Sequence, residues 1–257
     1  MFSELFKINL RNIPTCREVL LNLLDDKSIL KILYYIIFIL LLSISGCSVY
    51  SPHLVDIPLI SEKSELRFDG GYTWQNMFYG SFSYGLTKSI ALQTFFNKDA
   101  GEAFYFQNAA GYYRKIGEDA VMEIWGGYGF GRTDIGNHDI PTKLNGSQSL
   151  TFAQFNIGRK DVGKAHFDFG FGLKGGWFQA DLMDYNYFAH IPQYNGSAEP
   201  LMIKSFILEP GMFFRLGGEH IKFSFKFGAC KSFQQNNIEK PLPVEELNYG
   251  IGINCRF

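Results

Sequence analysis

The sequence lacks a strong excess of either charge, and it contains few cysteines. Its 257 residues hold 24 Lys and Arg against 25 Asp and Glu, a balance that gives no reason to expect a nucleic-acid partner. The only cysteines are Cys16, Cys47, Cys230 and Cys255, and no CxxC, GxSxG or HExxH motif occurs. Because the common redox, hydrolase and metalloprotease motifs are missing, we predict no cofactor and no metal site.

An apolar run near the N-terminus is too short to cross a membrane comfortably as a helix. The run from Ile32 to Ile44 follows Lys27 and Lys31, whereas a spanning helix needs about 20 residues. A short apolar core behind positive residues is typical of a signal peptide. We therefore predict a leader that is removed from the mature chain.

The tetrapeptide Ile44-Ser45-Gly46-Cys47 follows this core. It resembles the lipobox of bacterial lipoproteins, which consists of an aliphatic residue, a small residue, Gly or Ala, and then Cys. The resemblance implies cleavage before Cys47 and a diacylglycerol thioether on that residue. The predicted parts are a leader over 1–46, a lipidated tether over 47–63 and a folded domain over 64–257. An ordinary signal peptide with a chance cysteine is the alternative.

No stretch after Cys47 shows sustained helical periodicity. Short runs rich in Phe, Tyr and Ile alternate with clusters of Gly, Asn, Asp and Lys, which predicts an all-β fold. The ten predicted strands are 64–74, 77–86, 89–97, 102–114, 120–132, 149–160, 165–178, 202–216, 220–232 and 246–257. We expect an antiparallel up-and-down transmembrane β-barrel of about ten strands, with eight as the alternative.

The lengths of the connections favour a barrel over a soluble sandwich. Connections after the second, fourth, sixth and eighth strands are short, whereas those at 133–148, 179–201 and 233–245 are long. Outer-membrane barrels have short periplasmic turns and longer extracellular loops. The alternation predicts that both ends of the barrel chain are periplasmic.

Alternation within strands separates an apolar face from a charged one. At 165–178 one face carries Phe167, Phe169, Phe171, Leu173 and Trp177, and the other carries His166, Asp168, Gly170, Gly172 and Lys174. Period alone permits either face to point inward. Ten strands could not enclose so many aromatic rings, and glycine alternating with charge suits a polar lumen in which small residues make room for long ones. We therefore predict that the apolar face contacts lipid.

The C-terminal strand ends on an aromatic residue after strict alternation. Tyr249, Ile251, Gly252, Ile253, Cys255 and Phe257 fall on a pattern that resembles the assembly signal of bacterial outer-membrane barrels. Gly250 departs from it, because a polar residue is usual there. The resemblance implies a bacterial outer-membrane location, with membrane lipids and the barrel-assembly and lipoprotein-sorting machinery as partners.

The predicted lumen contains charges of both signs. The cations are Arg67, Lys174, Arg215, Lys222, Lys226 and Arg256, and the anions are Asp69, Glu123, Asp168 and Glu209. Because an isolated buried charge is very costly, these groups should pair into a network that fills the barrel. A selectivity lining for small polar solutes is the alternative.

Three functional hypotheses follow. The first is a non-enzymatic barrel with a structural, adhesion or surface-binding role, which would use the predicted loops 133–148 and 179–201. In the alternative for these loops, they do no more than cap the barrel mouth. The alternatives are a narrow porin-like channel and a rim-located enzyme. His166 and Asp168 share a face and are the residues considered for catalysis, but they follow a short turn. We predict a non-enzymatic barrel of unknown ligand.

Cys230 and Cys255 fall on opposite faces of neighbouring predicted strands. A disulfide requires Cβ vectors that face each other. We therefore predict two free thiols.

Overall fold

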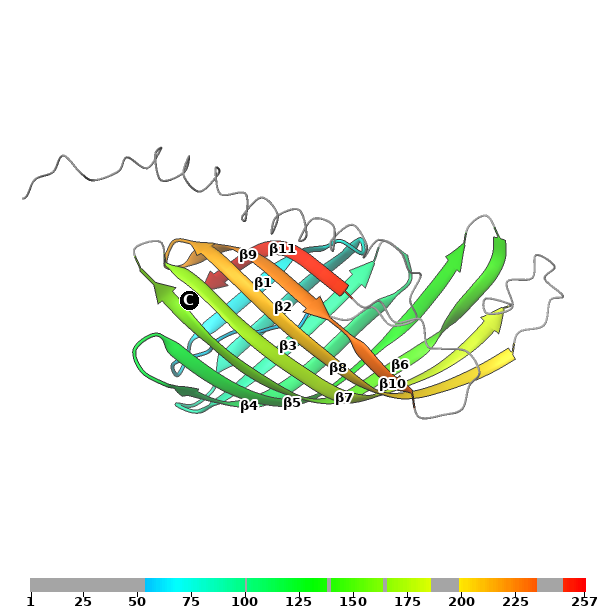
Figure 1. Ribbon diagram of the computed structural model, residues 1–257, viewed down its shortest axis with the longest axis horizontal. Coiled ribbons are helices and arrows are strands. Elements are labelled where there is room, and N and C mark those ends of the chain that lie inside the picture. The colour runs from blue at the N-terminus through cyan, green and yellow to red at the C-terminus, as the bar shows by residue number, and fades with distance from the viewer. Residues whose placement is uncertain (1–53, 100, 138–139, 164–165, 186–198, 235–246) are drawn as a thin grey trace, which may run out of the picture. The chain divides into compact units, whose positions relative to one another are not determined.

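The described part of the chain is a single antiparallel sheet that closes on itself (Figure 1). The computed structural model describes residues 54–99, 101–137, 140–163, 166–185, 199–234 and 247–257. The strands are β1 (Leu66–Thr73), β2 (Met77–Gly85), β3 (Ile90–Asp99), β4 (Phe104–Lys115), β5 (Ala120–Asn137), β6 (Ile140–Val162), β7 (Phe167–Tyr185), β8 (Glu199–Gly217), β9 (Ile221–Ala229), β10 (Lys231–Gln234) and β11 (Leu247–Arg256). Within these ranges no helix is long and apolar enough to cross a membrane.

The ring has ten strand positions. From β1 to β8 each strand pairs with the next, β11 pairs with both β1 and β9, and β8 pairs with both β9 and β10. β9 and β10 therefore form one position that is interrupted at Cys230. The prediction of a ten-strand antiparallel barrel is confirmed.

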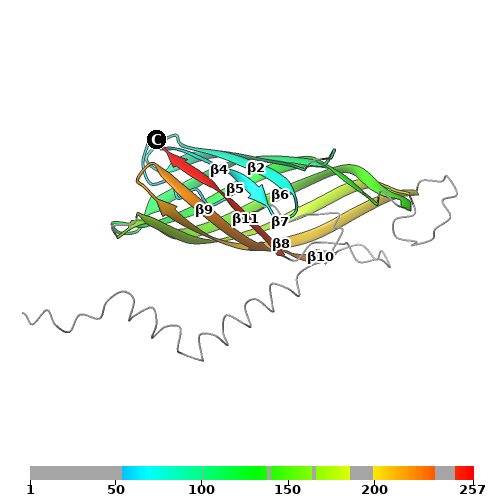
Figure 2. The same ribbon diagram turned by 90° about the horizontal axis from the view of Figure 1, so that it is seen from above.

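The four strands β5 to β8 are much longer than the others. They contain 18, 23, 19 and 19 residues, whereas β1 to β4 contain 8 to 12. At about 3.3 Å per residue and a tilt of about 40°, the short strands rise roughly 20–30 Å, close to the apolar band of about 25 Å in membrane barrels. The long strands run past this height, away from the end where the C-terminus lies (Figures 1 and 2).

The prediction of loops was wrong for most of 133–148 and for the described part of 179–201. Residues 133–137, 140–148, 179–185 and 199–201 belong to the long strands. The outward positions in and next to these ranges include Arg132, Ser147, Gln179 and Asp181, all exposed. A strand that projects into water does not need the apolar outward face by which lipid-facing strands are recognised. Residues 138–139 and 186–198 lie outside the described residues.

The outer surface of the barrel is apolar. Large exposed side chains include Phe78 at 63%, Ile221 at 62% and Trp177 at 55% exposure, whereas Arg215 and Lys226 are buried inside. Ring contacts such as Phe68 with Phe82 join neighbouring strands on the outside. The prediction that the apolar face points outward is confirmed.

Residues 54–61 lie within the barrel and are here called the lumen segment. Leu54 to Ser61 are all buried, and Leu59 and Ile60 are completely so. Val55, Ile57 and Leu59 pack with Val121 and Phe213 of the wall. These residues belong to the predicted tether, which was expected to lie between a lipid and the barrel. In the structure they lie inside the ring. Residues 47–53 lie outside the described residues.

Both described cysteines are free, as predicted. Cys230 is buried between β9 and β10, while Cys255 is partly exposed on β11. Because they lie on different sides of the wall, they cannot form a bond without a rearrangement of the strands.

Candidate functional site

Side chains of the wall bind the backbone of the lumen segment. Gln154 Nε2 donates to the carbonyl oxygen of Asp56 at 2.8 Å, and Arg215 Nη2 donates to the carbonyl oxygen of Ile57 at 2.9 Å. The Ile60 N–H donates to Glu123 Oε1 at 2.6 Å. Backbone groups that would be costly to bury alone are thus satisfied by polar wall residues.

Glycines of the wall make room for the lumen segment. A Cβ atom added to Gly172 would lie 2.9 Å from both Val55 and Ile57, and one on Gly250 would lie 2.6 Å from Leu54. A Cβ on Gly158 would lie 2.8 Å from Leu59. Inward glycines were predicted to make room for long polar side chains, and at these positions they make room for another part of the chain.

The central cluster consists of Asp56, Asp69, Arg215 and Lys226. Lys226 Nζ lies 2.8 Å from Asp56 and 2.9 Å from Asp69, and Arg215 Nη2 lies 3.3 Å from Asp69. Gln93 donates to Asp56 at 3.0 Å, and Asn254 donates to Asp69 at 3.1 Å. The cluster joins the lumen segment to β1, β8 and β9, so it fixes the segment in register with the wall.

The rim cluster lies where the lumen segment passes into β1. It consists of Glu65, Arg67, Lys160, Asp161, Asp168, Lys222 and Arg256. Lys222 Nζ lies 2.7 Å from Asp161 and 2.5 Å from Asp168. Lys160 contacts both Ser61 and Glu65. These ion pairs connect the end of the lumen segment to β6, β7 and β9.

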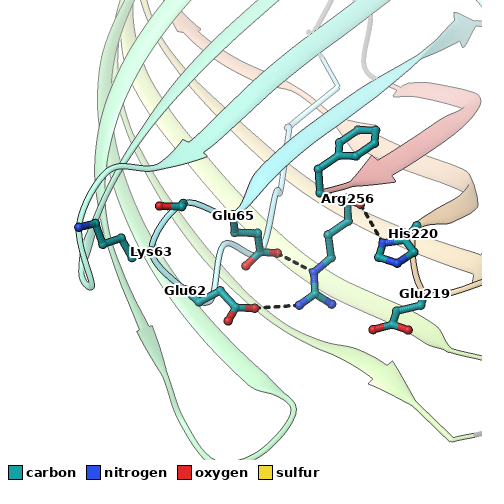
Figure 3. Close-up of a pocket in the computed structure, with 8 residues that line it drawn as sticks. Glu62, Lys63, Glu65, Glu219, His220 and Arg256 are labelled. Carbon is teal, nitrogen blue, oxygen red and sulfur yellow. Dashed lines mark hydrogen bonds and ion pairs between the residues drawn. The ribbon is translucent and has the colours of Figure 1, made fainter.

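Arg256 forms ion pairs at the C-terminal end of β11. Its guanidinium lies 3.0 Å from Glu62, 3.2 Å from Glu65 and 2.7 Å from Asp161. Figure 3 shows Arg256 with Glu62 and Glu65 on one side and His220 on the other, in a hollow of about 240 Å³. Reciprocal backbone hydrogen bonds between Leu66 and Phe257 close the seam next to it.

Glu65 is held in its charged form. Burial raises the pKa of this carboxyl, but the nearby charges of Arg67 and Lys160 outweigh that effect and lower the pKa to about 2. The carboxylate also accepts hydrogen bonds from the N–H and the hydroxyl of Ser61 at 2.8 and 2.9 Å. A charged Glu65 therefore ties the lumen segment to the start of β1.

The remaining predicted lumen residues are also inside the barrel. Lys174 and Glu209 form an ion pair at 2.5 Å, and Lys174 lies over the ring of Phe152. Glu123 accepts hydrogen bonds from Ile60, Asn156 and Trp125 rather than from a predicted cation. Arg256 differs from the rest because it lies at the rim and is partly exposed.

His166 and Asp168 are not arranged as a pair. His166 Nδ1 lies 3.6 Å from Asp161, while Asp168 contacts Lys222 and Arg67. His166 is partly exposed at the rim. Among the described residues, no group of three His, Cys, Asp or Glu is placed to hold a metal ion.

The residues of the predicted assembly signal lie along β11 and at its end. Ile251, Ile253 and Phe257 are exposed on the outside, and Tyr249 stacks on Trp74. Gly252 faces inward, where an added Cβ would lie 2.5 Å from the hydroxyl of Tyr79. The outward residues continue the apolar surface up to the last residue.

Sequence reasoning missed several residues of the lumen. Asp56, Glu65 and Lys160 all form buried ion pairs. Asp56 and Glu65 lie before β1, where no alternation marks an inward face. The sequence Leu54-Val55-Asp56-Ile57 places an aspartate between aliphatic residues. This pattern could have indicated a buried ion pair, because a buried carboxylate needs a cation.

Apolar side chains fill the lumen beyond the lumen segment. The buried cluster includes Tyr105, Leu150, Phe152, Phe178, Ala180, Leu182, Ile203 and Ile207. Most of these residues lie on the long strands β6 to β8. The described interior thus has a charged part that contains the lumen segment and an apolar part that belongs to the long strands.

A closed antiparallel ring with an apolar exterior and buried ion pairs inside defines a β-barrel of the transmembrane type. No protein-family model and no curated protein matches the sequence. The chain is similar to the outer membrane protease OmpT from Escherichia coli, with 9% identity and a TM-score of 0.47 over 76% of this chain and 93% of OmpT. It is also similar to the outer membrane protein Omp33 from Acinetobacter baumannii, with 9% identity and a TM-score of 0.32 over 78% of this chain and all of Omp33. These likenesses concern the fold.

Proposed function

We propose that the protein is a lipid-anchored, non-conducting and non-enzymatic barrel of the bacterial outer membrane, with a structural or surface-binding role. The observation that carries this proposal is the occupied lumen. The lumen segment and the two ion clusters fill one part of the interior, and apolar side chains fill the other. A filled interior supports a scaffold over a channel.

The long strands support a surface-binding role. Beyond the outward aromatic residues Phe130 and Trp177, several exposed positions are polar, as at Arg132, Gln179 and Asp181, and Met183 and Met202 are exposed among them. A polar sheet that continues above an apolar belt is suited to contacts in water, because a rigid wall supports it. We place this extension on the outside of the cell and the barrel termini in the periplasm.

The first experiment asks whether the barrel conducts ions. We expect the purified chain to give no steady conductance in planar bilayers. Fractionation should place it in the outer membrane, with a heat-dependent shift on gels. Steady channels, changed by neutralising Arg215 or Lys222, would replace the scaffold by a pore. A soluble protein without a gel shift would overturn the membrane assignment.

The second experiment tests the anchor and the absence of catalysis. Labelled palmitate should enter the wild-type chain and should not enter Cys47→Ala. Incorporation that persists in Cys47→Ala would remove the predicted lipid site. A lipid- or peptide-cleaving activity that is lost in His166→Ala, with the fold intact, would identify a rim enzyme instead.

A further inference from the structure

Side chains of the wall form hydrogen bonds with backbone groups of the lumen segment, and these bonds do not depend on the segment's side chains. Gln154, Arg215 and Glu123 each bind one backbone group, at Asp56, Ile57 and Ile60 in turn. These three residues come from β6, β8 and β5. Side chains from several strands that converge on the backbone of one segment form a peptide-binding arrangement.

The wall also fixes where each side chain of the segment lies. Gly250, Gly172 and Gly158 leave space in turn for Leu54, for Val55 with Ile57, and for Leu59. An added Cβ at any of them would lie within 3.0 Å of the segment. Asp56, between Val55 and Ile57, faces Lys226 and Gln93 instead, so the wall fits aliphatic side chains and one carboxylate in a single register.

The wall supplies more positive than negative charge at Asp56. Of the wall residues in the central cluster, Arg215 and Lys226 are cations and Asp69 is the anion. Asp56 of the segment balances the second cation through its 2.8 Å contact with Lys226. With the segment absent, a buried positive charge would remain uncompensated, so the site selects a carboxylate.

From these three observations we infer that this part of the lumen is a binding site for an aliphatic peptide with one carboxylate. Residues 54–61 occupy the site within the chain, and a separate peptide of the same chemistry can replace them. The ligand class follows from the contacts: aliphatic side chains lie opposite the glycines, a carboxylate lies opposite Lys226, and backbone groups bind Gln154, Arg215 and Glu123.

The test uses the full chain in detergent micelles with residues 54–60 changed to Gly and Ser at equal length. A fluorescein-labelled peptide of the sequence Leu-Val-Asp-Ile-Pro-Leu-Ile is the probe, and anisotropy reports its binding. Trp125 gives a second signal, because its Nε1 donates to Glu123, which also binds the Ile60 N–H. We expect saturable binding that is at least about tenfold tighter than binding to the wild-type chain, whose own segment competes.

Two matched controls test the chemistry of the site. A peptide with Asn in place of Asp should bind about tenfold or more weakly, since it loses a charged contact. Adding Lys226→Met to the Gly/Ser chain should abolish this preference, because Arg215 and Asp69 then balance. Absent binding, or equal binding of the Asp and Asn peptides, by a Gly/Ser chain that keeps its gel shift would overturn the inference.

If the Gly/Ser chain does not fold, Asp56→Asn provides the test. This variant keeps the aliphatic contacts and removes the negative charge that faces Lys226. The labelled Asp peptide should then bind about tenfold more tightly than it binds the wild-type chain. Binding no tighter than that of the wild-type chain would overturn the inference.

Discussion

The lumen near the C-terminus contains ion pairs and the lumen segment, whereas the lumen of the long strands contains apolar side chains. In the first part, charged groups such as Lys226 and Asp69 are as deeply buried as the aliphatic residues of the lumen segment. In the second part, Leu150, Phe178 and Ile207 belong to a cluster of buried apolar side chains, which the ion pair of Lys174 with Glu209 contacts at the ring of Phe152. Both fillings exclude solvent, but the first consists mainly of charged partners matched at fixed distances.

The two parts of the lumen should therefore respond differently to the loss of one side chain. Removing one buried charge leaves its partner unpaired, so the damage extends to neighbouring strands. Removing an apolar group leaves a cavity whose cost depends on local relaxation. The two parts should therefore differ in their dependence on charge and pH.

Lys226→Met should have the largest effect. It leaves Asp56 without its lysine and Asp69 with only Arg215, and the loss of unfolding free energy should be about 3–5 kcal/mol. Urea unfolding followed by tryptophan fluorescence in micelles measures it. Lys88→Met, at an exposed turn position, is the control and should change little. A loss below about 1 kcal/mol for Lys226→Met would contradict a tightly paired central cluster.

Leu150→Ala should have the next largest effect. Leu150 is completely buried in the apolar part, and the expected loss is about 3 kcal/mol. Unlike a change in the ion clusters, this loss should stay the same between pH 4 and pH 8. A loss that varies with pH would show that the two parts of the lumen are coupled.

Acid should weaken the charged part before the apolar part. Glu65 has a lowered pKa of about 2, against an ordinary value of 4.5, so its contribution is complete above pH 4.5 and is lost as pH falls toward 2. The slope is at most about 1.4 kcal/mol per pH unit for this proton. Unfolding measured from pH 5 to pH 2.5 should be less pH-dependent in Glu65→Gln than in the wild-type chain. Parallel curves for the two chains would remove Glu65 from the acid response.

Arg159→Ala should have the smallest effect. Arg159 lies 3.4 Å from Asp119, but the two side chains are 54% and 38% exposed. Exposed pairs contribute about 0.2–1 kcal/mol, so the change in unfolding free energy should be below about 1 kcal/mol. A larger loss would mean that burial is not what separates this pair from Lys226 and its partners.

Alternation in the sequence predicts the wall well. Phe171 and Trp177 lie outward, and Asp168 and Lys174 lie inward, because a strand turns its side chains to opposite faces. The extent of the long strands could not be predicted in this way, since Ser147 and Gln179 lie outward in a polar stretch that resembles a loop.

The occupant of the lumen could not be predicted from alternation. Asp56 is paired with Lys226 across 170 positions of sequence, and nothing local to either residue indicates the other. Glu123 illustrates the same limit, because its predicted inward position is correct while its partner, the Ile60 N–H, belongs to a segment without strand periodicity. Contacts between the wall and the lumen segment depend on closure of the ring.

The position of the lumen segment has a consequence for the order of assembly. Only Glu62 to Glu65 separate it from β1, and the ring closes where β1 pairs with β11. Because this connection is so short, the segment is already beside β1 while the strands assemble. We expect it to lie against the curling sheet first and to act as a template, so that the pairing of β1 with β11 comes last.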